Sequence, residues 1–340
     1  MKSADSPVAD VIEAGDCVGE MSIIDGQPTS AYVVATKPST VIAVHESVFW
    51  SKIAINPKAV RNLTRVLAER MRKRNAATLR ALEHEMRLEQ LEKELLAAHE
   101  IQIGMLPQGS TLLAEMPGLD VHARMDVVTS VGGDFYAALA LDDRNAYITV
   151  GDVSGKGMPA ALFMVRTLTL LRAELAKSGD LAECVVRFNK ILCNTNISHM
   201  FVTLVVLRID LVNGTLEYVN AGHPPMLLSR GNAPFVEVDE SEGLIAGVID
   251  DHAYQSRTLQ LEHGDRLIIY TDGVTEARNQ FNRFYSEERL IDLVSHHEAS
   301  DAAQLVSTIF EDAHGYSAGI PQSDDITVVA VGFYDRTSTR

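Results

Sequence analysis

V-G-D-V-S-G-K-G-M-P-A-A-L, residues 150–162, contains the change of secondary structure on which the fold depends. It follows the apolar run Ala146–Val150, which predicts a strand, and it leads into the helix-forming stretch Pro159–Ala176. Proline is favoured in the first turn of a helix, so Pro159 indicates where this helix begins. Asp152 is therefore expected where the strand ends, beside glycines that allow a tight turn.

Three other acidic motifs have the same context. Asp134 lies in V-G-G-D-F-Y, Asp272 in Y-T-D-G-V-T-E, and the pair Asp324-Asp325 in S-D-D-I-T-V-V. Each motif follows or precedes an apolar run, so each carboxylate is expected at the end of a strand. Hard divalent cations such as Mg²⁺ and Mn²⁺ bind oxygen ligands, and clustered carboxylates supply them. One such motif alone is more typical of a plain turn, but the set predicts a metal-dependent enzyme.

The composition is that of a globular protein with two folded units. The 340 residues are 46% hydrophobic, and the three cysteines (Cys17, Cys184, Cys193) lack metal-ligand spacing. A net charge of -16 argues against a nucleic-acid partner, because binding phosphates needs clustered positive charge. The apolar runs are too short for a membrane span, and no signal-peptide pattern is present. We therefore expect a cytoplasmic protein with reduced thiols and with no nucleic-acid or membrane partner.

Residues 1–57 differ in amino-acid composition from the rest of the chain. They are rich in β-branched residues, with turn signals such as Asp25-Gly26 and Lys37-Pro38. The stretches Ala31–Ala35 and Thr40–Val44 predict short strands. The segment is too short to be a robust domain by itself.

Residues 58–106 predict one long helix, because they are mostly strong helix formers and hold no glycine before Gly104. A mostly apolar seam recurs at steps of three and four with one break in phase: Leu79, Leu82 and Met86, then Leu88, Leu91, Leu95, Ala98, Gln102 and Met105. This seam predicts a parallel coiled-coil homodimer with a stutter-like irregularity. The alternative is a single solvated helix that packs on the downstream domain.

Residues 107–336 alternate strand-like runs with helical windows. Strands are expected over Ala146–Val150, Val202–Ile209, Leu216–Val219, Arg266–Tyr270 and Ile326–Phe333. Helices are expected over Pro159–Ala176, Leu181–Asn194, Ser286–Ser295 and Ala302–Ala313. Short turns such as Val212-Asn213-Gly214 connect consecutive strands, so the pattern predicts an α+β unit with mostly antiparallel sheets.

Taken in order, the motifs closely resemble those of the metal-dependent serine/threonine protein phosphatases, the PPM or protein phosphatase 2C-like family. They are V-G-G-D-F-Y, G-D-V-S-G-K-G-M-P-A-A-L, N-A-G-H-P-P, Y-T-D-G-V-T-E-A and D-D-I-T-V-V. The resemblance is strongest to the bacterial branch of sporulation-protein-E-like and sigma-factor-regulating phosphatases. It begins at I-Q-I-G-M-L-P and covers roughly residues 100–335. It implies an α-β-β-α sandwich of two antiparallel sheets, with metals at one end between the sheets.

The resemblance also implies a role for each matched residue. Asp152 would bridge two ions, Mn²⁺ or Mg²⁺, and the backbone carbonyl of Val153 would complete one coordination sphere. Asp272 and Asp324 would hold one ion, and Asp134 would support the other. Two cations about 4 Å apart would polarise a bridging water for in-line attack on a phosphoryl group.

Other matched positions have less defined roles. Asp325 is a further candidate ligand, at a position where relatives carry Asn or Asp. Lys156 is a candidate for binding the substrate phosphate, although a loop lysine is more typically solvated, and His223 is expected to be a hydrogen-bonded structural histidine. Ala137 stands where many bacterial relatives have an acidic residue, and Ser154 where eukaryotic relatives have a histidine that is a candidate general acid. The general acid is therefore left open, and water can serve.

Residues 13–57 resemble the second half of a cyclic-nucleotide-binding domain, through E-A-G-D-C-V-G-E-M-S-I-I-D-G-Q-P-T-S-A-Y-V-V-A. Gly19-Glu20 would begin the phosphate-binding cassette, in which the glutamate takes the ribose hydroxyl. Thr29 stands where an arginine should pair with the cyclic phosphate, so the strongest charge-assisted contact is missing. We therefore expect a partial, structural module and no cyclic-nucleotide binding.

Three functional hypotheses follow from these motifs. The leading one is a protein phosphatase that acts on a small phosphorylated regulatory protein, an anti-sigma-factor antagonist, with the helix transmitting a state of the N-terminal segment to the metal site. The second is a catalytically weak phosphatase-like binding module, and the third is a regulator that responds to a cyclic nucleotide. The intact aspartates favour the enzyme.

Overall fold

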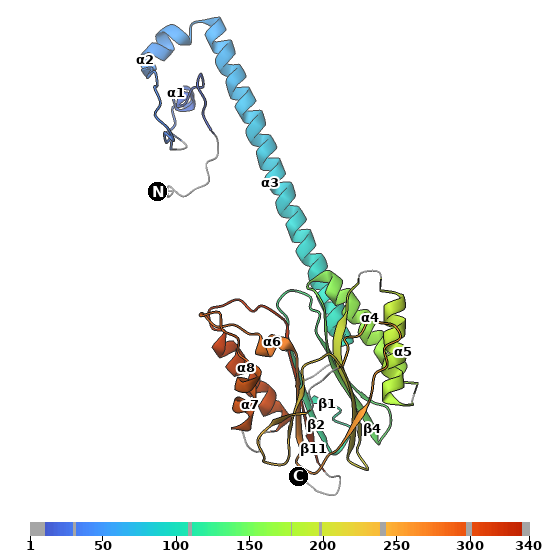
Figure 1. Cartoon of the computed structure of the whole chain (residues 1–340). Coiled ribbons are helices and arrows are strands. Elements are labelled where there is room, and N and C mark those ends of the chain that lie inside the picture. Colours follow the sequence, from blue (N-terminus) through green and yellow to red (C-terminus); the bar gives the residue numbers. More distant parts are fainter. Residues whose placement is uncertain are drawn as a thin grey trace. The chain divides into compact units, whose positions relative to one another are not determined.

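The computed structural model describes residues 11–29, 32–107, 111–177, 179–196, 199–238, 243–296 and 301–334. The chain divides into two compact units, Met1–Leu88 and Glu89–Arg340. The boundary falls within the long helix α3 (Pro57–Met105), so each unit contains part of that helix (Figure 1). Among the helices described, none is long and apolar enough to span a bilayer.

The first unit holds three short helical segments before α3. They are α1 (Glu20–Asp25), α2 (Glu46–Val48) and a π-helical turn, η1 (Phe49–Ile53). One ion pair ties α1 to α3, because the Arg70 guanidinium lies 2.8 Å from Glu20 Oε1. Arg70 also donates a hydrogen bond of 2.6 Å to the carbonyl oxygen of Cys17. Glu20 is only 8% exposed, and the arginine offsets the cost of burying its charge.

The strands predicted over Ala31–Ala35 and Thr40–Val44 are wrong. Residues 32–35 and 40–44 are irregular, and Ala31 lies outside the described residues. A strand needs a neighbour to bond its backbone N–H and C=O groups, and the part of this unit that the structure describes contains no strand. The β-branched side chains accordingly stay in solvent, with Val34 77% and Ile42 92% exposed.

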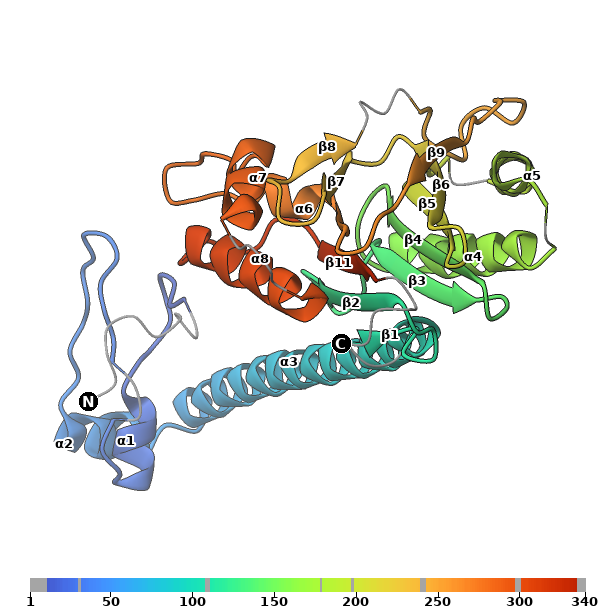
Figure 2. The ribbon, with the colours of Figure 1, turned by 90° about the horizontal axis from the view of Figure 1, so that it is seen from below.

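The second unit contains two antiparallel sheets that face each other (Figure 2). The first has the order β1-β2-β11-β10-β7-β8, with β1 (Thr111–Leu112), β2 (Leu119–Asp126), β11 (Ile326–Phe333), β10 (Arg266–Tyr270), β7 (Met226–Ser229) and β8 (Val236–Val238). The second has the order β3-β4-β5-β6-β9, with β3 (Phe135–Ala140), β4 (Asn145–Val153), β5 (Val202–Asp210), β6 (Thr215–Ala221) and β9 (Arg257–Gln260).

Helices cover the outer faces of both sheets (Figure 1). On the second sheet, α4 (Met158–Leu175) packs against β3 and β4, and α5 (Leu181–Asn194) packs against β6 and α4. On the first sheet, α8 (Ala302–Tyr316) contacts β2 and β11, and α7 (Glu287–Ser295) packs against α8. The layers are therefore α-β-β-α, and the predicted α+β fold is confirmed.

Strand β11 lies between two hydrophobic cores. All of its residues are buried, and they alternate between the cores because successive side chains of a strand point to opposite faces. Val329 and Val331 belong to the larger core, with residues of the second sheet, α4 and α5. Val328 and Ala330 belong to the core formed with α7 and α8. The buried strand therefore holds the layers together and fixes the residues that precede it.

Most long elements of this unit match their predicted ranges within a few residues. The strands that were not predicted are β1, β2, β3, β7, β8 and β9. In β2 the sequence L-D-V-H-A-R-M-D alternates apolar and polar residues, and its burial alternates accordingly over most of the strand. That period of two is typical of a half-buried strand and would have identified it. Strands β8 and β9 have only three and four residues, which is too short for a periodic signal.

Candidate metal centre

Strand ends from both sheets carry the predicted carboxylates. Asp134 directly precedes β3, and Asp152 is the second-last residue of the neighbouring β4. Asp272 begins the short helix α6 (Asp272–Thr275) after β10. Asp324 and Asp325 directly precede β11, which pairs with β10. The two pairs of adjacent strands thus bring all five side chains to one end of the sandwich.

The pKa values reflect how close these carboxylates lie to one another. Burial, together with the negative charge of Asp272, raises the pKa of Asp152 to about 7. Burial and the charge of Asp152 raise the pKa of Asp134 well above its usual value. Burial, then the charges of Glu276 and Asp324, raise the pKa of Asp272. Desolvation and like charges both disfavour ionised carboxylates, so the cluster favours an added cation.

The donor chemistry of the cluster fits Mn²⁺ or Mg²⁺. Every candidate side chain offers carboxylate oxygens, the donors that hard divalent cations prefer, and a bound cation would relieve the mutual repulsion. The side chains do not converge in advance: within the described ranges, no three His, Cys, Asp or Glu residues form a group that could hold an ion as they stand. Ion binding would therefore have to draw the carboxylates together.

Asp134 is the most enclosed of the candidates, with 2% of its surface exposed. Its Oδ2 accepts hydrogen bonds from the hydroxyls of Thr271 at 2.8 Å and Thr327 at 2.6 Å. Both threonines are fully buried. Neither threonine was predicted from the sequence as a site residue, although Thr271 adjoins Asp272 and Thr327 lies in D-D-I-T-V-V. The position of each threonine within a motif that contains an aspartate is the feature of the sequence that could have identified it as a site residue.

Asp325 binds the backbone of the loop before Asp134. Its Oδ1 accepts from the Val128 N–H at 2.8 Å, and its Oδ2 accepts from the Gly133 N–H at 2.9 Å. A Cβ atom at Gly132 would overlap this carboxylate, and one at Gly133 would lie 2.7 Å from the carbonyl oxygen of Val153. The glycine pair is therefore required by close packing, and both oxygens of Asp325 are engaged in holding it.

Gln102, in the last turn of α3, reaches the same loop within the second unit. Its Nε2 donates to the Gly132 carbonyl oxygen at 2.6 Å, and its Oε1 accepts from the Gly132 N–H at 3.1 Å. It is the buried residue of this helix among those described, at 2% exposure. Gln102 was predicted only as a position of the coiled-coil seam and not as part of the site. A polar residue at a position of the seam that is otherwise apolar is the feature of the sequence that could have indicated a hydrogen-bonding partner outside the coiled coil.

Lys156 pairs with one of the candidate ligands. Its Nζ lies 2.9 Å from Asp324 Oδ2 and also donates to the Ser323 carbonyl oxygen. The pair is open to solvent, with 55% of the lysine and 42% of the aspartate side chain exposed. The lysine therefore gives Asp324 a partner that solvent and ions can displace.

His223 and Ser154 both contact neighbouring strands of the second sheet. Burial lowers the pKa of His223 to about 3, and its Nδ1 lies 3.1 Å from Thr203 Oγ1. This neutral ring fits the structural role expected for it. The Ser154 hydroxyl accepts from the Phe201 N–H at 2.9 Å, so Ser154 fixes the turn that follows Asp152.

A groove of about 230 Å³ lies beside the motifs. It is lined by Gly273 and Ser323, the chain neighbours of Asp272 and Asp324, and by residues of the loop 317–323. Arg278 and His314 also line it. The groove therefore offers room and positive charge next to two candidate ligands.

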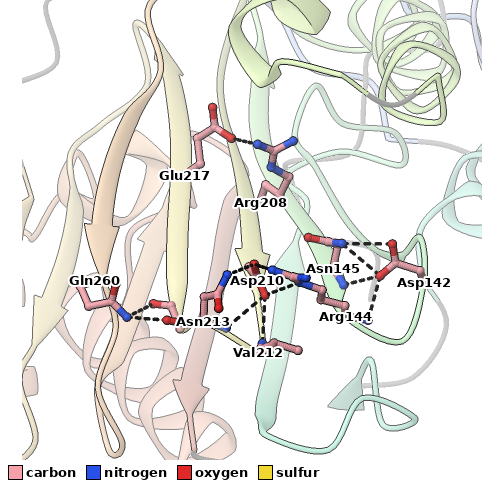
Figure 3. A network of polar contacts seen from close by, with 10 residues as sticks. Asp142, Arg144, Asn145, Arg208, Asp210, Val212, Asn213, Glu217 and Gln260 are labelled. Atoms are coloured by element: carbon pink, nitrogen blue, oxygen red, sulfur yellow. Dashed lines mark hydrogen bonds and ion pairs between the residues drawn. The ribbon is translucent and has the colours of Figure 1, made fainter.

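The opposite end of the β4–β5 ladder holds a carboxylate in a very different setting, Asp210 at the end of β5. Asp210 pairs with Asn145 at the far end of the β4–β5 ladder from Asp152. It accepts hydrogen bonds from Arg144 Nε at 2.9 Å and Nη2 at 2.6 Å, and from the Val212 N–H at 2.9 Å (Figure 3). The hydrogen-bonded Arg144 lowers the pKa of Asp210 to about 2.

A family model described as Stage II sporulation protein E matches residues 142–334, more than half of the chain. The chain belongs to the SpoIIE family. A cyclic nucleotide-binding domain model also matches residues 1–56, in agreement with the resemblance of the N-terminal segment. The family recognised from the motifs is therefore confirmed.

Individual relatives agree with this membership. Protein IcfG of Synechocystis is 31% identical over 70% of this chain and 41% of its own length. Phosphoserine phosphatase RsbU of Bacillus subtilis is 27% identical over 81% of this chain and 80% of its own. The chain thus spans less than half of the first relative and most of the second.

Solved structures share the fold. The RsbU and RsbW domains of Rv1364c from Mycobacterium tuberculosis superpose with a TM-score of 0.56 at 27% identity, over 65% of this chain and 61% of that one. The SiaA-PP2C domain of Pseudomonas aeruginosa superposes with a TM-score of 0.64 at 21% identity, over 72% and 98%. This second likeness supports the sandwich fold alone.

Proposed function

We propose that this chain is a metal-dependent protein phosphatase that hydrolyses phosphoserine or phosphothreonine. The observation that carries the proposal is the cluster of carboxylates from both sheets, whose pKa values are raised by burial and by one another. Such mutual repulsion opposes folding, and it is typical of a site kept for a ligand or for chemistry. The similarity to phosphoserine phosphatase RsbU over 81% of this chain supports the same reaction.

The proposed roles follow the matched motifs. Asp152 would be shared by two ions, Mn²⁺ or Mg²⁺, and the Val153 carbonyl would supply a further oxygen. Asp272 and Asp324 would hold one ion, and Asp134 would support the other. When bound, the ions would supply an activated water and stabilise charge during in-line displacement at phosphorus. The chain contributes the orientation of these oxygens, which the ends of four neighbouring strands set.

Asp325 and Lys156 are proposed to have roles other than binding a metal ion. Both oxygens of Asp325 already accept backbone N–H groups, so we assign it to anchoring the glycine loop in place of binding an ion. The exposed Lys156 ammonium is proposed to contact the substrate phosphate, because a bound cation at Asp324 would release it. The Ser154 hydroxyl accepts from the Phe201 N–H, and water is proposed to serve as the general acid.

The substrate is proposed to be a phosphorylated regulatory protein of the anti-sigma-factor antagonist type, as the bacterial branch of the family implies. The groove lined by Arg278 and His314 supports a protein substrate, because it offers room for chain on one side of the phosphorylated residue. A cytoplasmic location belongs to the same proposal.

The rest of the chain is proposed to be regulatory, with a partial cyclic-nucleotide-binding-like segment over 1–57, a helical linker over 58–106 and the phosphatase domain over 107–336. The first segment is proposed to be structural and not a nucleotide binder. Glu20, which would take a ribose hydroxyl, is paired with Arg70, and Thr29 brings no positive charge to a cyclic phosphate.

The linker is proposed to form a homodimer through its seam, of which the first five side chains are exposed in the single chain: Leu79 59%, Leu82 51%, Met86 63%, Leu88 49% and Leu91 48%. Sedimentation of Leu91→Asp tests this. A shift from dimer to monomer is expected, because a charge in a coiled-coil seam is desolvated without a partner. Leu96→Asp is the matched control, since Leu96 is 57% exposed and lies off the seam. A monomeric wild-type chain would refute the dimer.

The proposed activity is tested by Mn²⁺-dependent hydrolysis of p-nitrophenyl phosphate and of a phosphoserine protein. We expect Asp152→Asn to abolish both reactions, because it removes the bridging charge. Asp251→Asn makes the same chemical change at an exposed position and should leave both rates unchanged. A folded wild-type chain that binds a phosphoprotein but shows no Mn²⁺-dependent turnover would instead support the binding-module hypothesis.

A further inference from the structure

Three buried polar side chains form a closed set at the site end of the sandwich. Thr271 and Thr327 are fully buried and Asp134 is 2% exposed. Thr271 follows β10 and Thr327 lies in β11, both in the first sheet, whereas Asp134 precedes β3 of the second sheet. The hydrogen bonds among them therefore join the two sheets across the region where the candidate ligands lie. We refer to Thr271 and Thr327 as the threonine pair.

The direction of each hydrogen bond in the set can be assigned. A hydroxyl has one proton to donate. Thr271 Oγ1 accepts from the Thr327 N–H at 3.0 Å, so its own proton is free to point to Asp134 Oδ2, 2.8 Å away. The Thr327 hydroxyl donates to the same oxygen at 2.6 Å. The Thr271 N–H donates to the Thr327 carbonyl oxygen at 3.0 Å, which fixes the two threonines relative to each other.

These contacts occupy one oxygen of Asp134 and leave the other. Two hydroxyl donors use the accepting capacity of Oδ2. The Asp134 carboxyl also lies close to that of Asp152, and Oδ1 is the oxygen left for a cation. The carboxylate cannot turn without leaving two buried hydroxyls unpaired, which costs about 1–3 kcal/mol for each.

We propose that the threonine pair positions Asp134 so that it offers Oδ1 alone to a divalent cation shared with Asp152. The inference rests on the proposed metal-dependent activity and assigns to Thr271 and Thr327 a positioning role, exerted through Asp134. Partners that orient a metal ligand by hydrogen bonding typically change metal affinity when they are removed. The threonine methyl groups matter less than the hydroxyls, so serine should replace threonine in this role and valine should not.

The test measures Mn²⁺ binding to the full chain by isothermal titration calorimetry, with thermal melting of the metal-free chain alongside. Thr327→Val is expected to weaken Mn²⁺ binding roughly 10- to 100-fold, and Thr271→Val should do the same. Thr327→Ser should restore binding, because it returns the hydroxyl. Thr149→Val is the matched control: Thr149 is also buried in a strand, but its hydroxyl donates to the Val205 carbonyl oxygen at 2.8 Å, away from Asp134.

The outcomes separate this inference from the activity on which it rests. If the wild-type chain binds Mn²⁺ and hydrolyses phosphate esters but both valine variants bind Mn²⁺ equally well, the positioning role is refuted and the activity stands. The same holds if Thr149→Val weakens Mn²⁺ binding as much as Thr327→Val does, because the effect is then general loss of packing. If the folded wild-type chain binds no Mn²⁺, both proposals fail.

Discussion

The two ends of the β4–β5 ladder hold carboxylates of opposite character. Asp210, beside the start of β4, is bonded by Arg144 and by backbone N–H groups, and its pKa falls to about 2 (Figure 3). Asp152, near the end of β4, is buried close to other negative charges, and its pKa rises to about 7. Both residues occupy the same β4–β5 ladder. The difference therefore comes from the side chains around each aspartate and not from the backbone that carries it.

This difference separates charges that stabilise the fold from charges that repel one another and are available to bind a cation. At the Asp210 end, each carboxylate oxygen meets a donor, as buried and half-buried charges in proteins generally do. At the Asp152 end, the described cation in contact with the cluster is Lys156, which is exposed and bonded to Asp324. The motifs that resemble those of phosphatases lie at this end. Stability is thus reduced at the end where the carboxylates would bind ions.

The largest expected effect comes from neutralising one aspartate at each end. Asp210→Ala should lower the free energy of unfolding by about 2 kcal/mol or more, because it leaves Arg144 and several backbone donors without their acceptor. Asp152→Asn should raise the melting temperature of the metal-free chain, because it removes a repelled charge. Thermal denaturation in EDTA measures both changes. Equal destabilisation by the two variants would remove the distinction between the ends.

The pH dependence of stability tests the same distinction. For Asp152, the pKa is about 7 in the folded chain, against an ordinary value of 3.8 for an aspartate in water, so between these values the folded state binds more protons than the unfolded state. Stability contributed by protonated Asp152 is then present at low pH and is lost as pH rises through 7. For Asp210 the pKa is lowered, so its contribution is present at neutral pH and is lost as pH falls from about 4 towards 2.

The melting temperature of the metal-free chain is therefore expected to rise as pH is lowered from 8 to about 5.5. Asp152→Asn should flatten this slope, and excess Mn²⁺ should do so as well, because a bound cation favours the ionised carboxylates. Asp251→Asn should keep the wild-type slope. A melting temperature that falls steadily from pH 8 to 5.5 would contradict the raised pKa of Asp152.

The long elements of the second unit could be predicted because their apolar runs and helical windows are periodic. Ile326–Phe333, for example, is found at the bounds predicted from its uninterrupted apolar run. In the first unit, Thr40–Val44 has the same β-branched character but no neighbouring strand among the described residues, so it stays irregular. Local propensity is the same in both cases, and tertiary pairing decides the outcome.

Site residues could be predicted where the residue type itself indicates the chemistry. They were missed where their role depends on a contact with a distant part of the chain. Asp134, Asp152, Asp272 and Asp324 stand in motifs whose acidity is visible in the sequence. Gln102 contacts a loop 30 residues away. The threonine pair contacts Asp134 across more than 130 residues. Only the folding of the two sheets together brings such partners within reach, so a local pattern could single out these residues but could not identify what they contact.

A smaller effect is expected from removing the contact between α3 and the glycine loop. Gln102→Leu should cost about 1–3 kcal/mol, because the N–H and C=O groups of Gly132 lose their partner in a buried place. It should also weaken Mn²⁺ binding, since the loop precedes Asp134. Gln90→Leu is the matched control, because Gln90 is exposed on the same helix and its side chain donates to Glu94, one turn along. Loss of stability with unchanged Mn²⁺ affinity would limit Gln102 to a structural role.

The smallest expected change in stability comes from Lys156, the cation at the Asp152 end. Lys156→Gln should alter the free energy of unfolding by no more than about 1 kcal/mol, because the Lys156–Asp324 pair is exposed and surface ion pairs contribute little. Arg144→Gln, at the other end of β4, should cost more, because Arg144 makes a two-point contact with Asp210. If Lys156 binds the substrate phosphate, Lys156→Gln should instead raise KM for a phosphoprotein. An unchanged KM together with a large loss of stability would mean that Lys156 stabilises the fold as Arg144 does, and the contrast between the two ends would then rest on the aspartates alone.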